Sequence, residues 1–127
     1  MKEIIAIVRQ NKVNETKEAL AEAGFPAFTC RRVLGRGKKL IDMTLLRDIV
    51  EAGEIPATST GEYLSEMNRL ISKRVFTVIA EDKDVGHLVD TIIESNSTGN
   101  PGDGKIFVLP IHENYRVRDG QLTTEAY

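Results

Sequence analysis

The chain has 127 residues, of which 41% are hydrophobic and 28% charged, as is ordinary for one soluble globular domain with a modest core. Its formal net charge of −2 argues against general nucleic-acid binding, because such binding requires a basic face. Cys30 is the single cysteine, which excludes an internal disulfide, disfavours a cysteine metal cage and fits a reducing, cytoplasmic setting. No apolar run reaches the length of a membrane span and no signal-peptide core opens the chain, so we expect no membrane insertion.

The N-terminal part of the chain predicts a strand, a helix and a second strand. Residues 2–9 form a short, isoleucine-rich run with charged ends, which is typical of a buried strand. Asn14 has the position of a helix N-cap, an apolar stripe follows at helical spacing, and Gly24 suits the end of the helix. Pro26 then begins an extended segment through Leu34, in which apolar and polar residues alternate only weakly.

A long connection over residues 36–72 follows, within a single domain that spans residues 1–127. Two short helices are expected in it, one capped by Asp42 and one opened by a capping box at Ser59–Glu62. A connection of this length inside a compact domain is usually functional or mobile. Both expected helices carry an apolar stripe, so we expect the connection to pack either on its own domain or on a partner.

The second half of the chain repeats the order of strand, helix and strand. Residues 73–80 predict a strand, and Asp82 or Asp84 is expected to cap the helix that follows. Residues 105–108 predict another strand after a glycine-rich stretch. The expected buried face of the helix comprises Val85, Leu88, Val89, Ile92 and Ile93.

Two β-α-β units in tandem predict an α+β fold of the ferredoxin-like βαββαβ type, with the long loop between the second and third strands. Each helix must bury its apolar stripe on one face of the four-stranded sheet. The other face of the sheet would then be bare. A trimer or dimer would cover that face, so we predict an oligomer.

The stretch Thr98–Val108 contains three glycines within six residues, between the second predicted helix and its strand. Glycine lets a backbone approach a ligand closely, so the stretch can offer N–H groups and the Lys105 ammonium to an anion. It is not the common phosphate loop, because a helix precedes it and Ile106 replaces the hydroxyl residue that binds magnesium there. The spacing alone fits a glycine-rich turn with a surface lysine equally well.

Two further basic groups accompany this stretch. Residues 31–39 hold five basic side chains among nine residues, which fits either a solvated strand exit or a second anion-facing segment. In a last extended segment, residues 111–118, Arg116 and Arg118 lie two positions apart and would point to the same face. Taken together, the three basic groups favour a bound nucleotide over unrelated surface charges. The polar residues 121–127 are expected to be loose.

No arrangement of residues in this sequence resembles a catalytic set, so we do not expect an enzyme. His87 and His112 have no cysteine or histidine partner at metal-ligand spacing, and we predict no metal site built by protein side chains. Cys30 and a histidine far from it in the sequence do not suffice to predict a catalytic nucleophile. Tyr63 is either an apolar residue at the start of a helix or an exposed hydroxyl open to modification.

Residues Thr98–Val108 resemble, position for position, the highly specific C-terminal signature of the P-II nitrogen-regulatory signal transduction proteins. The similarity covers nearly the whole chain, including the opening Met1–Val8, the strand exit Gly35–Gly37, and Val89–Ile93. It implies a ferredoxin-like homotrimer with ATP or ADP in the clefts between subunits. It also implies 2-oxoglutarate bound beside ATP and Mg²⁺ at the base of the long regulatory loop, residues 36–72.

The resemblance also assigns residues to these ligands. Lys73 would face a carboxylate of 2-oxoglutarate, and Lys39 stands where the family usually has a glutamine that helps to hold Mg²⁺ at the same site. Thr29 would face the adenine, and the glycine-rich stretch would hold the phosphates. Residues at the base of the loop would line the site, and two arginines of the neighbouring subunit would reach the phosphates. These nucleotide-binding residues are Thr29, Gly35, Gly37, Lys38, Gly102, Asp103, Gly104, Lys105, Arg116 and Arg118.

The long loop, with Arg31–Lys38 before it, looks most like the branch of the family encoded with nitrogenase in archaea and some anaerobic bacteria. Resemblance to that branch implies direct binding and inhibition of dinitrogenase, relieved by 2-oxoglutarate and ATP, together with a second, shorter P-II-like subunit. One alternative is a P-II-type regulator of an ammonium transporter or of another enzyme of nitrogen metabolism. An alternative of another class is a nucleotide-hydrolysing enzyme on the same fold.

Overall fold

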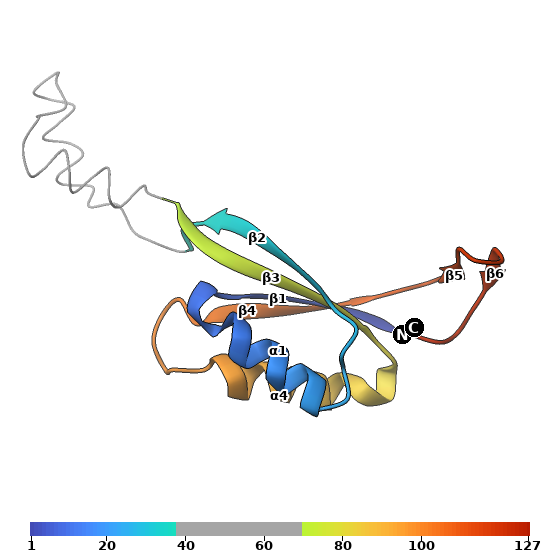
Figure 1. Ribbon diagram of the computed structural model, residues 1–127, viewed down its shortest axis with the longest axis horizontal. Coiled ribbons are helices and arrows are strands. Elements are labelled where there is room, and N and C mark those ends of the chain that lie inside the picture. The colour runs from blue at the N-terminus through green and yellow to red at the C-terminus, as the bar shows by residue number, and fades with distance from the viewer. Residues whose placement is uncertain (38–69) are drawn as a thin grey trace, which may run out of the picture. The chain divides into compact units, whose positions relative to one another are not determined.

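The computed structural model describes residues 1–37 and 70–127 (Figure 1). The backbone divides into two units, one made of Met1–Val33 with Ser72–Tyr127 and the other of Leu34–Ile71. The first unit contains the sheet core, the helices and the contacts discussed below. The capping residues of the two helices expected in the long connection lie outside the described residues, and so does Tyr63.

Four strands form one sheet in the order β2-β3-β1-β4. The central strand β1 (Lys2–Arg9) pairs antiparallel with β3 (Ile71–Ala80) on one side and with β4 (Gly104–Pro110) on the other. β2 (Thr29–Gly35) is the outer neighbour of β3. This order confirms the predicted α+β, ferredoxin-like βαββαβ fold.

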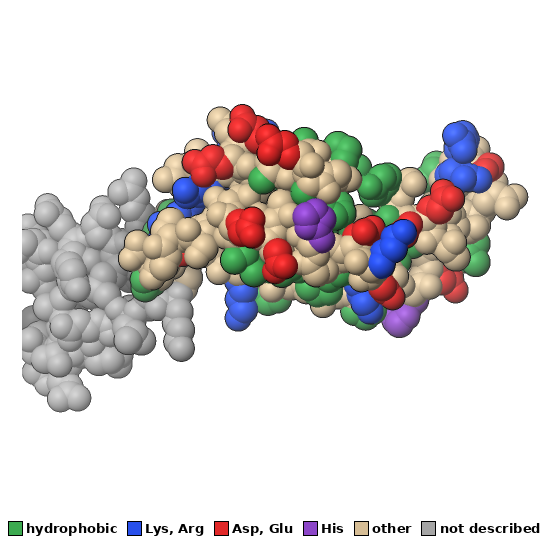
Figure 2. Space-filling view, turned by 90° about the horizontal axis from the view of Figure 1, so that it is seen from below, with side chains coloured by type: hydrophobic (Ala, Val, Ile, Leu, Met, Phe, Trp, Pro, Cys, Tyr) green, Lys and Arg blue, Asp and Glu red, His purple; other side chains and the backbone are tan. Residues whose placement is uncertain are grey.

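Two helices, α1 (Val13–Glu22) and α4 (Val85–Asn96), cover one face of the sheet (Figure 1). Seen from the helix side, acidic side chains are prominent on the surface (Figure 2). The exposed acidic residues of the two helices are Glu15, Glu18, Glu22, Asp90 and Glu94. The helices therefore present a charged outer surface and bury their apolar stripes on the sheet.

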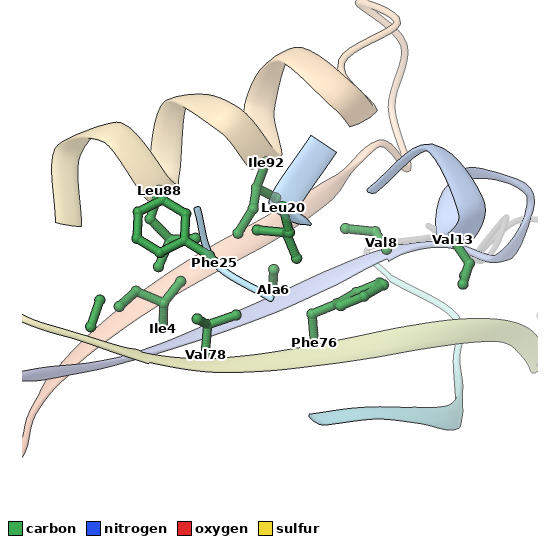
Figure 3. Close-up of a cluster of buried hydrophobic side chains, with 11 residues drawn as sticks. Ile4, Ala6, Val8, Val13, Leu20, Phe25, Phe76, Val78, Leu88 and Ile92 are labelled. Atoms are coloured by element: carbon green, nitrogen blue, oxygen red, sulfur yellow. The ribbon is translucent and has the colours of Figure 1, made fainter. Parts of the chain in front are cut away.

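The core lies between the sheet and the two helices (Figure 3). Alternate side chains of β1 are buried, as a period of two requires, and helical residues at four-residue spacing meet them. Ile93, which was expected on the buried face of α4, is 48% exposed, because the buried stripe narrows to Leu88, Ile92 and Asn96. The most completely buried side chains are Phe76, Ile4, Leu20, Leu88, Ile92, Val78 and Thr16.

The start of α1 differs from the prediction, whereas α4 begins at Asp84, one of its two predicted caps. Short 3-10 turns, Gln10–Lys12 and Asp82–Asp84, run directly into α1 and α4. Lys12, not Asn14, holds the N-cap position of α1, and Asp84 holds that of α4 without a side-chain capping bond. At each junction the 3-10 turn supplies one backbone bond, from the amide of Val13 to Gln10 and from the amide of Val85 to Asp82.

The C-terminal segment also differs from the prediction of one extended stretch over residues 111–118. β4 continues to Pro110, and a separate short hairpin then pairs β5 (Tyr115–Arg116) with β6 (Gln121–Leu122). Residues 117–120 form the turn between them. The hairpin exists because its chain reverses at an Asp-Gly pair, and Gly120 takes the positive φ of +68° that the reversal requires.

The last residues of the chain are held by specific bonds, although they were expected to be loose. The amide of Thr123 donates to the carbonyl of Asn114 (2.8 Å), and the Asn114 side-chain amide donates to the carbonyl of Glu125 (2.6 Å). Because β6 also belongs to this segment, the polar composition of residues 121–127 was a poor guide to its order.

Candidate functional site

Residues 98–104, here called the glycine loop, join α4 to β4. Gly99, Gly102 and Gly104 all have positive φ, at +82°, +95° and +130°. A Cβ added to Gly104 would lie 2.0 Å from the carbonyl oxygen of Ile7, a distance that no side chain tolerates. Glycine is therefore required at position 104 by the packing of the loop on β1, and the other two positions require it by their backbone angles.

The Asp103 side chain stabilises the glycine loop through hydrogen bonds to other residues of the loop. Its carboxylate accepts hydrogen bonds from the amides of Thr98 (2.7 Å) and Gly99 (3.0 Å), and from the Thr98 hydroxyl. The hydroxyl bond, followed by the Thr98 amide bond, lowers the pKa of Asp103 to about 2. The side chain is thus ionised and occupied by the loop itself, so that only the backbone amide of Asp103 can face an anion.

Two cations from neighbouring strands brace the glycine loop from outside. Arg9, at the end of β1, donates from Nη2 to the carbonyl of Pro101 (2.9 Å), and its Nε lies 3.4 Å from Asp103 Oδ1. Lys73 of β3 donates from Nζ to the carbonyl of Gly102 (3.0 Å). Arg9 and Lys73 are direct partners in the register of β1 and β3. No sequence pattern distinguishes Arg9, because its contacts are more than ninety residues away along the chain.

Lys105 follows the loop directly on β4 and is exposed. Its ammonium lies 5.6 Å from the centroid of the Phe107 ring, within the range of a cation–π contact. Within residues 1–37 and 70–127 no carboxylate pairs with it. The ammonium is therefore exposed beside the loop, where an anion could reach it.

The predicted arginine pair is arranged differently from the expectation. Arg116 is the last residue of β5 and forms a fork with the carboxylate of Asp119, with Nη2 to Oδ2 at 2.6 Å. This bond lowers the pKa of Asp119. Arg118 lies in the turn that follows, so the two arginines do not share one face of a strand. Among the described contacts, none joins either arginine to the glycine loop of the same chain.

The other predicted site residues lie at the start of β2, in the second unit of the chain, or outside the described residues. Thr29 is exposed at the start of β2. Gly35 and Gly37 belong to the second unit of the chain, where Gly37 has a positive φ of +66°. Lys38 and Lys39 lie outside the described residues. Among the residues that the structure describes, no group of three His, Cys, Asp or Glu side chains could hold a metal ion.

A largely apolar cavity of about 460 Å³ lies beside the glycine loop, between α4 and the β4 edge. Its volume falls within the range of small-molecule sites. Asp103, Gly104 and Lys105 form one side of it. The apolar side chains that line it are Ile7, Val8, Val89, Ile92, Ile93 and Ile106.

The sequence was compared with protein families and with curated proteins. The family described as "Nitrogen regulatory protein P-II" matches residues 1–121. The chain belongs to the P-II family. The resemblance seen in the sequence is thereby confirmed. Proteins of this family are regulatory signal transducers rather than enzymes.

Relatives of this P-II protein are found among methanogenic archaea. "Nitrogen fixation nifHD region GlnB-like protein 2" of Methanothermobacter marburgensis is 41% identical over 127 residues, covering 99% of both chains. The protein of the same description from Methanobacterium ivanovii is 42% identical over 129 residues, 99% of this chain and 98% of its own. "Nitrogen regulatory protein P-II 2" of Methanothermobacter thermautotrophicus is 36% identical over 126 residues, covering 99% and 96%. The names of the first two confirm the similarity to the branch of the family associated with nitrogen fixation.

No helix among the described residues is both long and apolar enough to cross a membrane.

Proposed function

We propose that this P-II protein is a nitrogen-regulatory sensor that binds ATP or ADP and 2-oxoglutarate and controls nitrogenase by ligand-dependent binding to dinitrogenase. The observation that carries the proposal is the glycine loop, whose backbone is held in place and followed by the exposed ammonium of Lys105. Backbone amides and a nearby ammonium are the groups that bind phosphates in proteins. The family match makes a regulatory nucleotide, rather than a substrate, the expected ligand.

Nucleotide binding is proposed to need a second subunit. Arg116 and Arg118 do not contact the glycine loop of their own chain, and the fork with Asp119 holds Arg116 at the hairpin. In a homotrimer the hairpin of one subunit would bring both arginines to the phosphates held by the next. Exposed apolar side chains support such an assembly, because a lone chain leaves Phe107 43%, Val117 97% and Leu122 61% exposed.

The regulatory step is proposed to be a shift in population. ATP with Mg²⁺ and 2-oxoglutarate, the latter near Lys73 and Lys39, would favour one arrangement of residues 36–72 over another. A shift from 1:99 to 99:1 in the ratio of partner-free to partner-bound protein requires the ligands to bind the free form about 5.5 kcal/mol more tightly. Several charge-assisted hydrogen bonds of about 1.5–3 kcal/mol each can supply it.

The proposed partner follows from the relatives. Their printed names place them in a nitrogen fixation nifHD region, which supports dinitrogenase as the target. Methanothermococcus thermolithotrophicus has both a GlnB-like protein 2 that is 40% identical to this chain and a GlnB-like protein 1 that is 38% identical. That pairing supports a second P-II-like subunit as a partner in the complex.

The test is calorimetric titration of ATP with and without 2-oxoglutarate and Mg²⁺, followed by a pull-down with dinitrogenase. We expect ATP to bind, 2-oxoglutarate to tighten that binding, and dinitrogenase to be released when both ligands are added. Absence of any heat or thermal shift with ATP would contradict the proposed sensor. Sustained phosphate release would instead indicate a nucleotide-hydrolysing enzyme.

One relative, "Nitrogen regulatory protein P-II 2", has a name without a nitrogen fixation region, which is consistent with a target other than dinitrogenase. The family resemblance makes an ammonium transporter or another enzyme of nitrogen metabolism the alternative target. The same pull-down separates the two, because this alternative predicts ligand-dependent capture of such a protein and no capture of dinitrogenase.

A further inference from the structure

We propose that Arg9 is a positioning residue for the glycine loop. Together with Lys73, Arg9 directs two backbone amides of the loop toward a bound phosphate, and it does not touch the phosphate itself. The proposal rests on the proposed function for the identity of the ligand. Its geometric part, the brace on the loop, rests only on contacts within one unit of the chain.

The brace acts on two successive peptide bonds. Arg9 Nη2 holds the carbonyl of Pro101 at 2.9 Å, and Lys73 Nζ holds the carbonyl of Gly102 at 3.0 Å. In a trans peptide the C=O and the following N–H point to opposite sides of the chain. The amides of Gly102 and Asp103 therefore point away from the two cations. Within residues 1–37 and 70–127 neither amide has a protein acceptor.

Two free amides in succession make a small anion-binding concavity. An unconstrained loop with a positive φ at Gly102 would sample many directions for these amides, since glycine restricts its backbone so little. Fixing their direction before the ligand arrives removes that ordering cost from the binding step. The two cations supply this pre-organisation from the side of the loop opposite the amides.

Packing confirms that Arg9 lies tightly against the loop. A Cβ added to Gly102 would lie 3.3 Å from Arg9 Nη2. The guanidinium also faces the Asp103 carboxylate, with Nη2 3.5 Å and Nε 3.4 Å from Oδ1. This carboxylate offsets the repulsion that two directly opposed cations, Arg9 and Lys73, would otherwise exert on each other across the strands. Arg9 thus connects the central strand to the loop at Pro101 and at Asp103.

The experiment compares Arg9→Gln, Arg9→Lys and the matched control Lys17→Gln in the full-length protein. Lys17 is exposed on α1, so its variant makes the same change of charge away from the loop. Two quantities are measured: the Kd for ATP by calorimetry, and the hydrogen-exchange rates of the Thr98 and Gly99 amides in the nucleotide-free protein. Both amides donate to Asp103 and so report on the loop directly.

We expect Arg9→Gln to raise the Kd for ATP about tenfold, the loss of one hydrogen bond to a charged group. The same variant should speed exchange of both amides, whereas Arg9→Lys should restore most of the affinity and Lys17→Gln should behave as wild type. A weaker Kd with unchanged exchange would show that Arg9 acts on the ligand itself and would overturn the positioning role. An Arg9→Gln Kd equal to that of Lys17→Gln would also overturn it.

Failure of the proposed function gives a different result. If the wild-type protein binds no nucleotide, the hydrogen-exchange rates alone test whether Arg9 holds the glycine loop in place. Faster exchange in Arg9→Gln than in Lys17→Gln would then support the brace, and equal exchange would overturn it.

Discussion

Replacement of Lys105 by alanine should weaken ATP binding without unfolding the protein. Lys105 is exposed, and its one described contact is the cation–π approach to Phe107 at 5.6 Å, so its removal costs the fold little. The bound phosphate would lose a charge-assisted hydrogen bond of about 1.5–3 kcal/mol, which corresponds to a roughly tenfold to hundredfold higher Kd.

The assay is calorimetric titration of ATP into the wild type, Lys105→Ala and the control Lys17→Ala. Lys17 is an exposed cation on α1, away from the glycine loop, and its replacement should leave the Kd unchanged. The thermal midpoint without nucleotide should be similar in all three proteins. If Lys105→Ala binds ATP as tightly as Lys17→Ala, the glycine loop is not the phosphate site and the reasoning fails.

Three further predictions concern stability and are checked by denaturant unfolding. Gly104→Ala should cost more than about 2 kcal/mol, because its Cβ would meet the Ile7 carbonyl at 2.0 Å on top of the strain of a positive φ. Thr16→Val should cost about 1–3 kcal/mol, because it removes the buried acceptor of the Asn96 side-chain amide at 3.0 Å. Asp103→Asn should destabilise the protein at neutral pH. The difference from wild type should shrink as the pH falls from 3.8 toward about 2, the folded-state pKa, where the wild-type carboxylate becomes protonated.

Each of these has an outcome that contradicts it. Gly99 has a positive φ but open space around it, so Gly99→Ala isolates the backbone strain; equal losses at Gly99 and Gly104 would rule out the clash. A Thr16→Val protein as stable as wild type would mean that the bond between α1 and α4 contributes nothing net. A difference between wild type and Asp103→Asn that persists below pH 2 would show that ionisation of Asp103 is not its source.

The strands and helices were predictable because their burial follows simple periods. Ile4, Ala6 and Val8 alternate along β1, and Leu88 and Ile92 recur at helical spacing, so each pattern reports directly on which face is covered. Contacts between residues far apart in the sequence produce no such periodic pattern. The brace by Arg9 depends on a loop more than ninety residues away, and nothing local to Arg9 distinguishes it from a solvated cation.

Local misjudgements have physical causes as well. Asn14 is a residue type that favours the N-cap, yet the 3-10 turn Gln10–Lys12 runs directly into α1 and places Lys12 at that position. Arg116 and Arg118 would share a face only on a continuous strand, but β5 ends at Arg116 and the chain turns over residues 117–120. The glycine loop was recognisable as a whole, but the sequence could not separate glycines needed for packing, such as Gly104, from those left free to meet a ligand.

Lys73 suggests how two ligand sites could influence each other in this fold. Its ammonium carries three donors and gives one to the Gly102 carbonyl, inside the proposed phosphate loop. On the proposed function the same ammonium also faces a carboxylate of 2-oxoglutarate. A dicarboxylate that draws the ammonium toward itself changes the hold on Gly102 and hence the direction of the Asp103 amide. Because such coupling is reciprocal, nucleotide bound to the loop must change the affinity for the dicarboxylate by the same factor.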